Sequence, residues 1–204
     1  AIDLRSNPGG LLTAAVQIAD DLLDKGKIVS TRGRMSINDT EFSAAPGDLM
    51  HGAPVVLIVD AGSASASEVL AGALGDNGRA RIDGSRTFGK GSVQTVLPLG
   101  NGDSVKLTTA RYFTPKGTSI QARGIDPDVV LKPDVAAKPG ETVASGPRIT
   151  EATLPGHLRG DLEDGSGAGD VLDGDGPINA ALAELKRPAA DVARSDAGAV
   201  PARQ

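Results

Sequence analysis

Residues 54–74 read PVVLIVDAGSASASEVLAGAL. The first seven residues form a continuous aliphatic run of strand length, which is typical of a strand buried on both faces in an α/β protein. Small residues follow, and apolar residues then recur at helical spacing. The stretch therefore predicts a central strand over 54–60, a sharp turn, and a helix over 64–77 with Ser65 at its start.

The flanking sequence continues this alternation of strands and helices. Upstream, we expect a strand at 1–5, a helix at 11–25, a strand at 27–31, and a polar connection or small hairpin over 33–52. Downstream, we expect a strand at 79–83, a hairpin of 92–99 with 103–113, and a last strand at 126–131. This order predicts a layered α/β fold, in which functional sites lie at the carboxyl ends of the strands.

Composition excludes several classes of function. The chain has 204 residues, of which 39% are hydrophobic, and this is enough for one domain with an apolar core. The net charge is −5, and no basic stretch is interleaved with aromatic residues, so nucleic acid is not an expected partner. Cysteine is absent, which excludes thiol catalysis and disulfides. A Ser-His-Asp mechanism would have to use His51 or His157, the only two histidines.

The two ends of the chain differ from its middle. The sequence begins without Met on a strand-like segment, and we interpret it as a fragment whose natural N-terminus is missing. After Lys132, Pro, Gly and Asp accumulate while large apolar residues become scarce. We therefore expect a folded core over 1–133, and a poorly structured linker and tail over 134–204 with a short helix at 178–186.

Ser65 is the first candidate for chemistry. It lies where a buried strand turns into a helix, and backbone N–H groups at a helix N-terminus are unpaired and favour negative charge. The N–H of Ala66 could therefore donate to an oxyanion on a carbonyl attacked by Ser65. The structural alternative is a capping box, because Glu68 follows Ser65 at the required spacing. Glu68 is also a candidate for an ion pair with Arg5.

Lys90 is the second candidate, within TFGKGSVQ at residues 87–94. A lysine acts as a base only when burial lowers its pKa from an ordinary value of about 10.4. Phe88 and Val93 could provide an apolar environment, and Gln94 could orient the amine. The alternatives are a solvent-exposed lysine and a phosphate-binding loop, although the segment lacks Walker A spacing.

The third candidate is the turn DLRSNPGG at residues 3–10. Proline fixes one dihedral angle, and the paired glycines leave the following amides free to point outward. Gly9 or Gly10 could donate the second hydrogen bond to an oxyanion, and the loss of one such donor typically costs about a hundredfold in rate. The alternative is a tight turn with no further role.

Taken together and in this order, DLRSNPGG, GSASASE (62–68) and FGKGSVQ (88–94) resemble the S41 carboxyl-terminal processing (tail-specific) proteases. The resemblance extends over about residues 1–130 and implies a layered fold of the ClpP/crotonase type. It implies that Ser65 is the nucleophile and Lys90 the general base, with Gln94 completing a Ser-Lys-Gln arrangement. It also implies an oxyanion hole of Ala66 with Gly9 or Gly10.

The resemblance implies a serine endopeptidase that cleaves protein or peptide substrates near their C-termini through an acyl-enzyme, without metal or cofactor. It also implies a periplasmic or cell-envelope location and an upstream PDZ domain in the full-length protein, and a homo-oligomer is possible. Two alternatives remain open. The chain could be a non-catalytic scaffold or an inactive fragment, or it could be a crotonase-like acyl-thioester enzyme that does not need Ser65 and Lys90 together.

Overall fold

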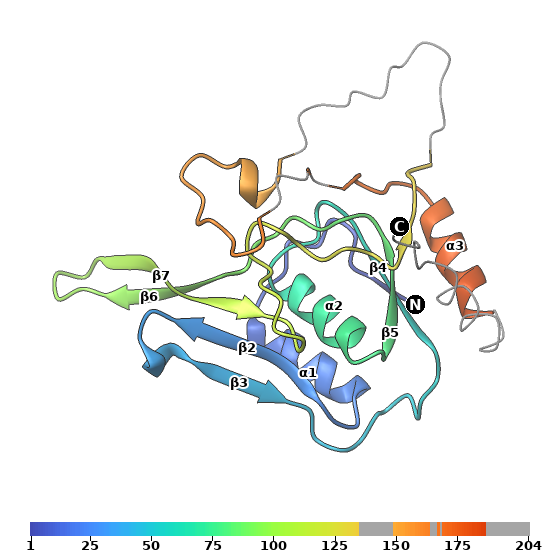
Figure 1. Ribbon diagram of the computed structural model, residues 1–204, viewed down its shortest axis with the longest axis horizontal. Helices are drawn as coiled ribbons and strands as arrows, with labels where there is room; N and C mark the ends of the chain where they lie inside the picture. The colour runs from blue at the N-terminus through green and yellow to red at the C-terminus, as the bar shows by residue number, and fades with distance from the viewer. Residues whose placement is uncertain (135–148, 164–166, 168, 187–204) are drawn as a thin grey trace, which may run out of the picture.

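The computed structural model describes residues 1–134, 149–163, 167 and 169–186 (Figure 1). The helices are α1 (Leu12–Leu22), α2 (Ala66–Asp76) and α3 (Gly176–Leu185), and the short 3-10 turns are η1 (Ser36–Asn38) and η2 (Glu151–Thr153). The strands are β1 (Ile2–Asp3), β2 (Lys27–Gly33), β3 (Thr40–Ser43), β4 (Val55–Val59), β5 (Ala80–Gly84), β6 (Ser92–Pro98), β7 (Ser104–Phe113) and β8 (Val129–Val130).

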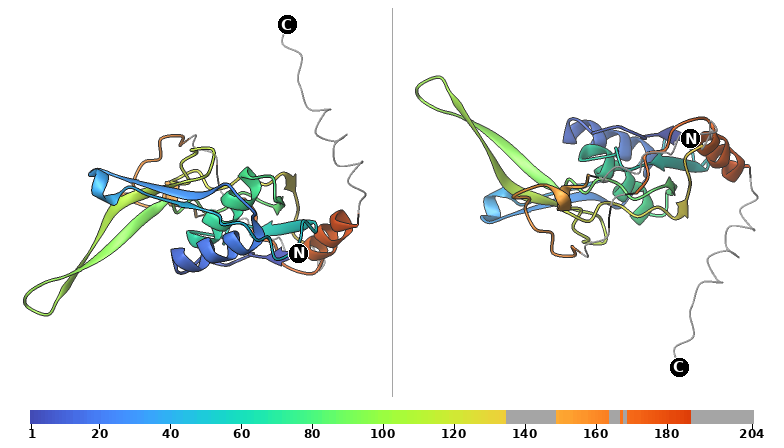
Figure 2. Two further views of the ribbon diagram at one scale, coloured as in Figure 1. Left: turned by 90° about the horizontal axis from the view of Figure 1, so that it is seen from below. Right: turned by 90° about the horizontal axis from the view of Figure 1, so that it is seen from above.

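The strands form two sheets. One is parallel, with the order β1-β4-β5-β8, and the other is antiparallel, with the order β3-β2-β7-β6. The expected hairpin is the β6–β7 pair, whose far end projects from the rest of the described fold (Figure 2). The polar segment after β2 forms the small hairpin that was one of the two expectations, because β3 pairs with β2.

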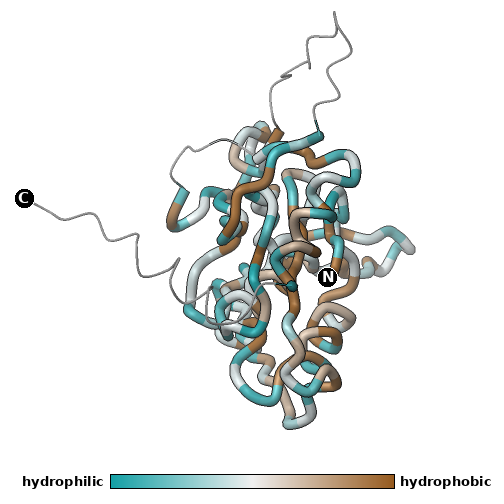
Figure 3. Tube along the Cα trace, turned by 90° about the vertical axis from the view of Figure 1, so that its right-hand side faces the viewer, coloured by the Kyte–Doolittle hydropathy of each residue, from teal (hydrophilic) through white to brown (hydrophobic). Residues whose placement is uncertain are grey.

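Strand β4 is the centre of the fold, and all five of its residues are buried. Val55, Leu57 and Val59 belong to the main hydrophobic cluster, which also includes residues of α1, α2 and β2. Val56 and Ile58 face the other way and pack with Ala181 of α3. Helices therefore cover both faces of the parallel sheet, and hydrophobic residues concentrate in the helices and strands (Figure 3). The prediction of a layered α/β fold is confirmed.

The segment after β8 differs in part from a simple linker. The expected short helix corresponds to α3, and described residues between 149 and 175 form hydrogen bonds to the core. Composition did not reveal these contacts because they are made largely by main-chain atoms. Gly160 and Gly169 allow close backbone approach, since a Cβ at either position would overlap Gln121 or Arg86. Residues 135–148, 164–166, 168 and 187–204 of the predicted linker and tail lie outside the described residues.

The described helices are short. The longest, α1 and α2, have 11 residues each, whereas a helix needs about 20 apolar residues to cross a bilayer. None of the helices in the described ranges has the length and hydropathy of a membrane span.

Candidate active site

Ser65 occupies a sharp turn between β4 and α2. Its backbone φ is 58° and its ψ is −117°, a combination that a residue with a side chain rarely adopts. Such strained positions cluster at functional sites, where the surrounding structure holds them in place. Ser65 is half-buried, and Ala66 begins α2 directly after it. Among the described residues, the N–H of Ala66 has no hydrogen-bond acceptor, as expected of the first turn of a helix.

The turn at Ser6–Gly10 lies against this helix N-terminus. The N–H of Ala64 donates to the carbonyl oxygen of Asn7 at 3.0 Å. Gly9 has a φ of 85°, and a Cβ there would lie 2.7 Å from the backbone nitrogen of Ala66. The N–H of Gly9 donates to Asn7 Oδ1 at 2.9 Å, whereas the N–H of Gly10 has no acceptor within the described residues. The structure therefore brings Gly9, Ser65 and Ala66 together, and the amides of Gly10 and Ala66 are unpaired within the part of the chain that it describes.

Asp60, at the end of β4, ties the two turns together. Its Oδ1 accepts the N–H of Ser6 at 2.8 Å and the N–H of Gly62 at 2.9 Å. The Oγ of Ser63 donates to the carbonyl oxygen of Leu4 at 2.7 Å. The side chains of Asp60 and Ser63 are buried, and their bonds fix the first turn relative to the second.

Glu68 links Ser65 to the loop that carries Lys90. Its Oε2 accepts the backbone N–H of Ser65 at 2.8 Å and that of Lys90 at 2.9 Å. Its Oε1 accepts the N–H of Gly89 at 2.7 Å and the hydroxyl of Thr87 at 2.5 Å. The expected capping interaction is thus present, and the same carboxyl also organises the second loop.

Glu68 is fully buried, and this burial raises the pKa of its carboxyl to about 7 although the four donated hydrogen bonds oppose the shift. The predicted ion pair between Glu68 and Arg5 is wrong. Arg5 pairs with Asp3 at 2.8 Å and also donates to the carbonyl oxygens of Leu172 and Gly174. Both carboxylate oxygens of Asp3 accept from the Arg5 side chain, whereas those of Glu68 accept from four other donors.

Lys90 lies on a loop that is held from several sides. The N–H of Phe88 donates to the carbonyl oxygen of Ser63 at 3.0 Å, so the loop is bonded directly to the turn that carries Ser65. Lys90 is half-buried. Within the described part of the chain, its amine forms neither a salt bridge nor a hydrogen bond, and it is therefore available to a partner at the site.

Among the described residues, no hydrogen bond links the side chain of Gln94 to Ser65, to Lys90 or to the turn at Ser6–Gly10. Gln94 lies on β6 opposite Thr108, just after an irregularity in the register of the β6–β7 pair. Its side chain is exposed and has no hydrogen-bond partner among the described residues. Its assignment to the site stays a prediction.

Within the described residues, neither histidine is hydrogen-bonded to the turns that carry Ser65 and Lys90. His51 is an exposed turn residue with a φ of 50°. His157 lies 3.1 Å from Glu163 and also bonds to the carbonyl oxygen of Leu154. Across the described ranges, no three His, Asp or Glu side chains are grouped so as to hold a metal ion.

Sequence reasoning missed several residues that shape the site. It identified Glu68 as a possible cap and as a possible ion-pair partner of Arg5, and it gave no role to Asp60, Thr87 or Gln121. The capping-box spacing was the one signal that pointed to Glu68. The other three are single polar residues in apolar or mixed stretches, and no local pattern distinguishes them.

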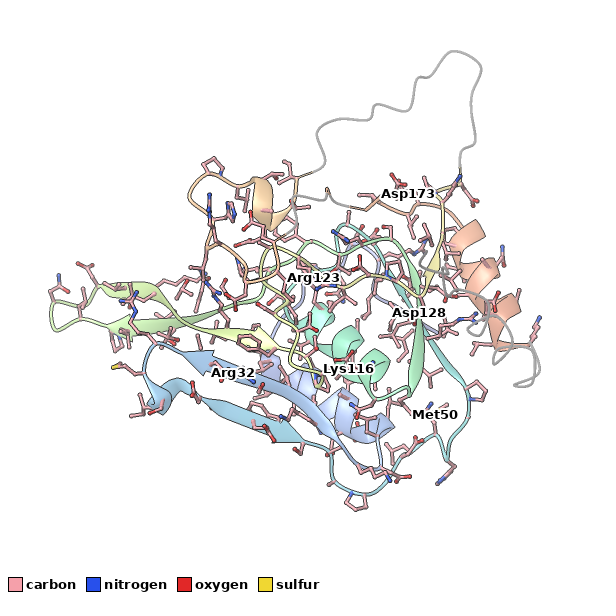
Figure 4. All side chains as sticks on the ribbon, viewed as in Figure 1. Arg32, Met50, Lys116, Arg123, Asp128 and Asp173 are labelled. Carbon is pink, nitrogen blue, oxygen red and sulfur yellow. The ribbon has the colours of Figure 1, made fainter. Side chains whose placement is uncertain are left out.

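A separate cavity of about 210 Å³ lies beside the C-terminal half of α2. Its lining includes Gly72, Asp76, Lys116, Arg123 and Asp128, the last three of which are labelled in Figure 4. None of the predicted site residues lines it. The candidate active site is therefore the group of turns at the N-terminal end of α2.

Known proteins share both the sequence and the fold of this chain. The profile of peptidase family S41 matches residues 1–131. A carboxy-terminal-processing protease of Bartonella bacilliformis is 49% identical over 169 residues, which are 82% of this chain and 38% of that protein. A chloroplastic C-terminal processing peptidase of Tetradesmus obliquus is 47% identical over 134 residues, or 66% of this chain and 29% of that protein.

A solved structure also resembles this chain in sequence and in fold. The photosystem II D1 C-terminal processing protease matches with a TM-score of 0.58 and 45% identity, over 65% of this chain and 34% of that one. The chain thus spans about a third of the length of these relatives. The profile match covers more than half of the chain and includes all three motifs, and the chain therefore belongs to peptidase family S41.

Proposed function

We propose that this chain is the catalytic core of a serine endopeptidase in which Ser65 is the nucleophile and Lys90 the general base. The observation that carries the proposal is the shared carboxyl of Glu68, which accepts the backbone N–H groups of both residues. The strained backbone of Ser65 supports it further, as does the amine of Lys90, which has no ion-pair or hydrogen-bond partner among the described residues. Membership of family S41 is consistent with the same assignment.

In the proposed first step, the uncharged amine of Lys90 takes the proton of the Ser65 hydroxyl. The Oγ then attacks a peptide carbonyl carbon, and the carbonyl oxygen becomes an oxyanion. The N–H groups of Ala66 and Gly10 are the proposed donors to this oxyanion because neither has an acceptor among the described residues. Gly9 holds the turn in place, since its own N–H is bonded to Asn7.

The tetrahedral intermediate then loses its amine. The C–N bond breaks, and Lys90 returns its proton to the leaving nitrogen, which leaves an ester on Ser65. In the second half, Lys90 takes a proton from water, the water oxygen attacks the ester carbon, and the Ser65 oxygen leaves with that proton. Gln94 is proposed to orient the amine of Lys90 during these transfers. A Gln94→Ala variant with unchanged kinetics would remove it from the mechanism.

The proposed substrates are proteins cleaved near their C-termini, as the names of the relatives state for those proteins. The proposed location is the periplasm or cell envelope, and the full-length protein is proposed to carry an upstream PDZ domain and to form a homo-oligomer. Fractionation of cells with an antibody to the protein tests the location. Light scattering on the purified full-length protein tests the oligomer.

Cleavage of casein by the full-length protein tests the catalytic assignment. Ser65→Ala and Lys90→Ala should each abolish cleavage while the fold is retained. Wild-type cleavage by both variants would show that the dyad is wrong. Mass spectrometry of the products tests the position of cleavage, which should lie within a short distance of the C-terminus.

A further inference from the structure

Gln121 is a fully buried side chain that the proposed mechanism does not use. Its Oε1 accepts the N–H of Gly91 at 3.1 Å. Its Nε2 donates to Oε1 of Glu151 at 3.0 Å and to the carbonyl oxygen of Leu158 at 2.8 Å. An amide bonded at both ends in a buried site is a rigid link between the segments that it joins.

One of these segments is the loop of the general base. Three successive amides of this loop are held by buried side chains. Glu68 accepts the N–H groups of Gly89 and Lys90, and Gln121 accepts that of Gly91. The backbone of Gly91 also lies directly on that of Gln121, because a Cβ on this glycine would overlap the Gln121 nitrogen. Gln121 therefore fixes the side of the loop that Glu68 does not reach.

The other segment is residues 149–160, which lie beyond the part of the chain matched by the S41 profile. Its Glu151 accepts from Gln121, and the N–H of Glu151 donates to the carbonyl oxygen of Phe88 at 3.1 Å. Gly160 lies against the carbonyl of Gln121, where a side chain would not fit. Residues 149–160 therefore contact the loop of Lys90 at Phe88 and, through Gln121, at Gly91.

We propose that Gln121 is a positioning residue for Lys90, and that residues 149–160 act on the general base through it. This inference rests on the proposed function. A lysine between two glycines has an unusually free backbone, so its amine reaches the serine hydroxyl reproducibly only if the loop is held from outside. A misplacement of about 1 Å can cost a hundredfold in rate.

The test uses the full-length protein and the rate at which a fluorophosphonate probe labels Ser65, measured against pH, with kcat and KM for a peptide substrate. Gln121→Met keeps the length of the side chain and removes all three hydrogen bonds. It should lower the labelling rate and kcat at least tenfold at pH 7.5, leave KM within about twofold, and move the rising limb of the pH profile to higher pH.

Two further variants test the link to residues 149–160. Glu151→Ala should lower the labelling rate about fivefold and shift the pH profile in the same direction, as expected for the loss of one buried hydrogen bond. Glu151→Gln keeps an acceptor oxygen and should restore the rate to within about twofold of wild type. Ile120→Val is the matched control, because Ile120 is a buried neighbour whose side chain makes no bond to the loop of Lys90. It should loosen packing without moving the pH profile.

The outcomes separate this inference from the proposed function. If Ser65→Ala and Lys90→Ala are inactive but folded Gln121→Met has the wild-type rate and pH profile, the positioning role is wrong and the catalytic assignment stands. If Gln121→Met does not fold, the two Glu151 variants provide the test. A wild-type labelling rate and pH profile for Glu151→Ala would then overturn the inference. Labelling that persists in Ser65→Ala would overturn the proposed function itself.

Discussion

Ser65 and Lys90 donate their backbone N–H groups to one and the same oxygen, Oε2 of Glu68, at 2.8 and 2.9 Å. The two backbone nitrogens are therefore only two hydrogen bonds apart, although the residues lie on different loops. A buried carboxyl that accepts from both loops fixes the distance between them more firmly than packing alone.

Replacing Glu68 with glutamine should lower the reactivity of Ser65 without removing either of the side chains that we propose to be catalytic. The amide nitrogen of Gln would face backbone N–H donors, so at least one of the two loops would lose its acceptor and shift. We expect the rate of Ser65 labelling at pH 7.5 to fall about a hundredfold in Glu68→Gln. Glu41→Gln is the control, since it alters an exposed ion pair with Lys27 on the edge strand β3 and should label at the wild-type rate. Equal rates for the two variants would contradict the role of Glu68.

The stability of the protein should depend on pH through the same residue. Burial raises the pKa of Glu68 from an ordinary value of 4.5 to about 7. The folded state keeps a proton that the unfolded chain releases, so the contribution of this group is full below pH 4.5 and is lost as the pH rises through about 7. Between pH 4.5 and 8 the free energy of unfolding of the wild type should fall relative to Glu68→Gln by about 3 kcal/mol. Urea unfolding at several pH values measures this difference, and parallel pH profiles would contradict it.

The strained backbone conformation of Ser65 should lower the free energy of unfolding of the protein. A φ of 58° with a ψ of −117° is readily adopted by glycine but strained for any residue with a Cβ. Ser65→Gly should therefore be more stable than Ser65→Ala by about 1 kcal/mol or more, and both should be inactive because both lack the hydroxyl. Urea midpoints of the two variants measure this. An alanine variant as stable as the glycine variant would show that the turn is not strained.

Gly9 should tolerate no side chain. A Cβ there would lie 2.5 Å from the carbonyl oxygen of Ala64 and 2.7 Å from the nitrogen of Ala66, and its φ of 85° disfavours other residues. We expect Gly9→Ala to lose about 1–3 kcal/mol of stability and most of the cleavage activity, because the turn must move away from the helix N-terminus. Gly100→Ala is the control, since Gly100 has open space around it and no left-handed φ. Similar stability for both variants would argue against the close packing of the two turns.

The parts of the fold and of the candidate site that could be predicted from the sequence are those that leave a local pattern in it. The aliphatic run of β4 and the helical spacing after it reveal the central strand and α2, because burial on each face repeats with a fixed period. The motifs predict catalytic roles for Ser65 and Lys90 through their resemblance to a family. The hydrogen bonds of Gln121 to Gly91 and of Asp60 to Leu172 join residues 30 and 112 positions apart, and no period in the sequence records such contacts.

The segment after β8 also makes contacts that could not be predicted from the sequence. A composition rich in Pro, Gly and Asp predicted a linker, yet the described residues of 149–163 bond to the core. The contacts use backbone atoms and glycines that allow close approach, and composition does not distinguish such glycines from those of a linker. Only the fold reveals which backbone groups meet.

The most direct test of the catalytic assignment is the site at which a fluorophosphonate probe modifies the full-length protein, determined by peptide mass spectrometry. We expect a single adduct on Ser65, and this adduct should fail to form in Lys90→Ala at neutral pH. An adduct on another serine, or labelling of Lys90→Ala at the wild-type rate, would contradict the catalytic assignment.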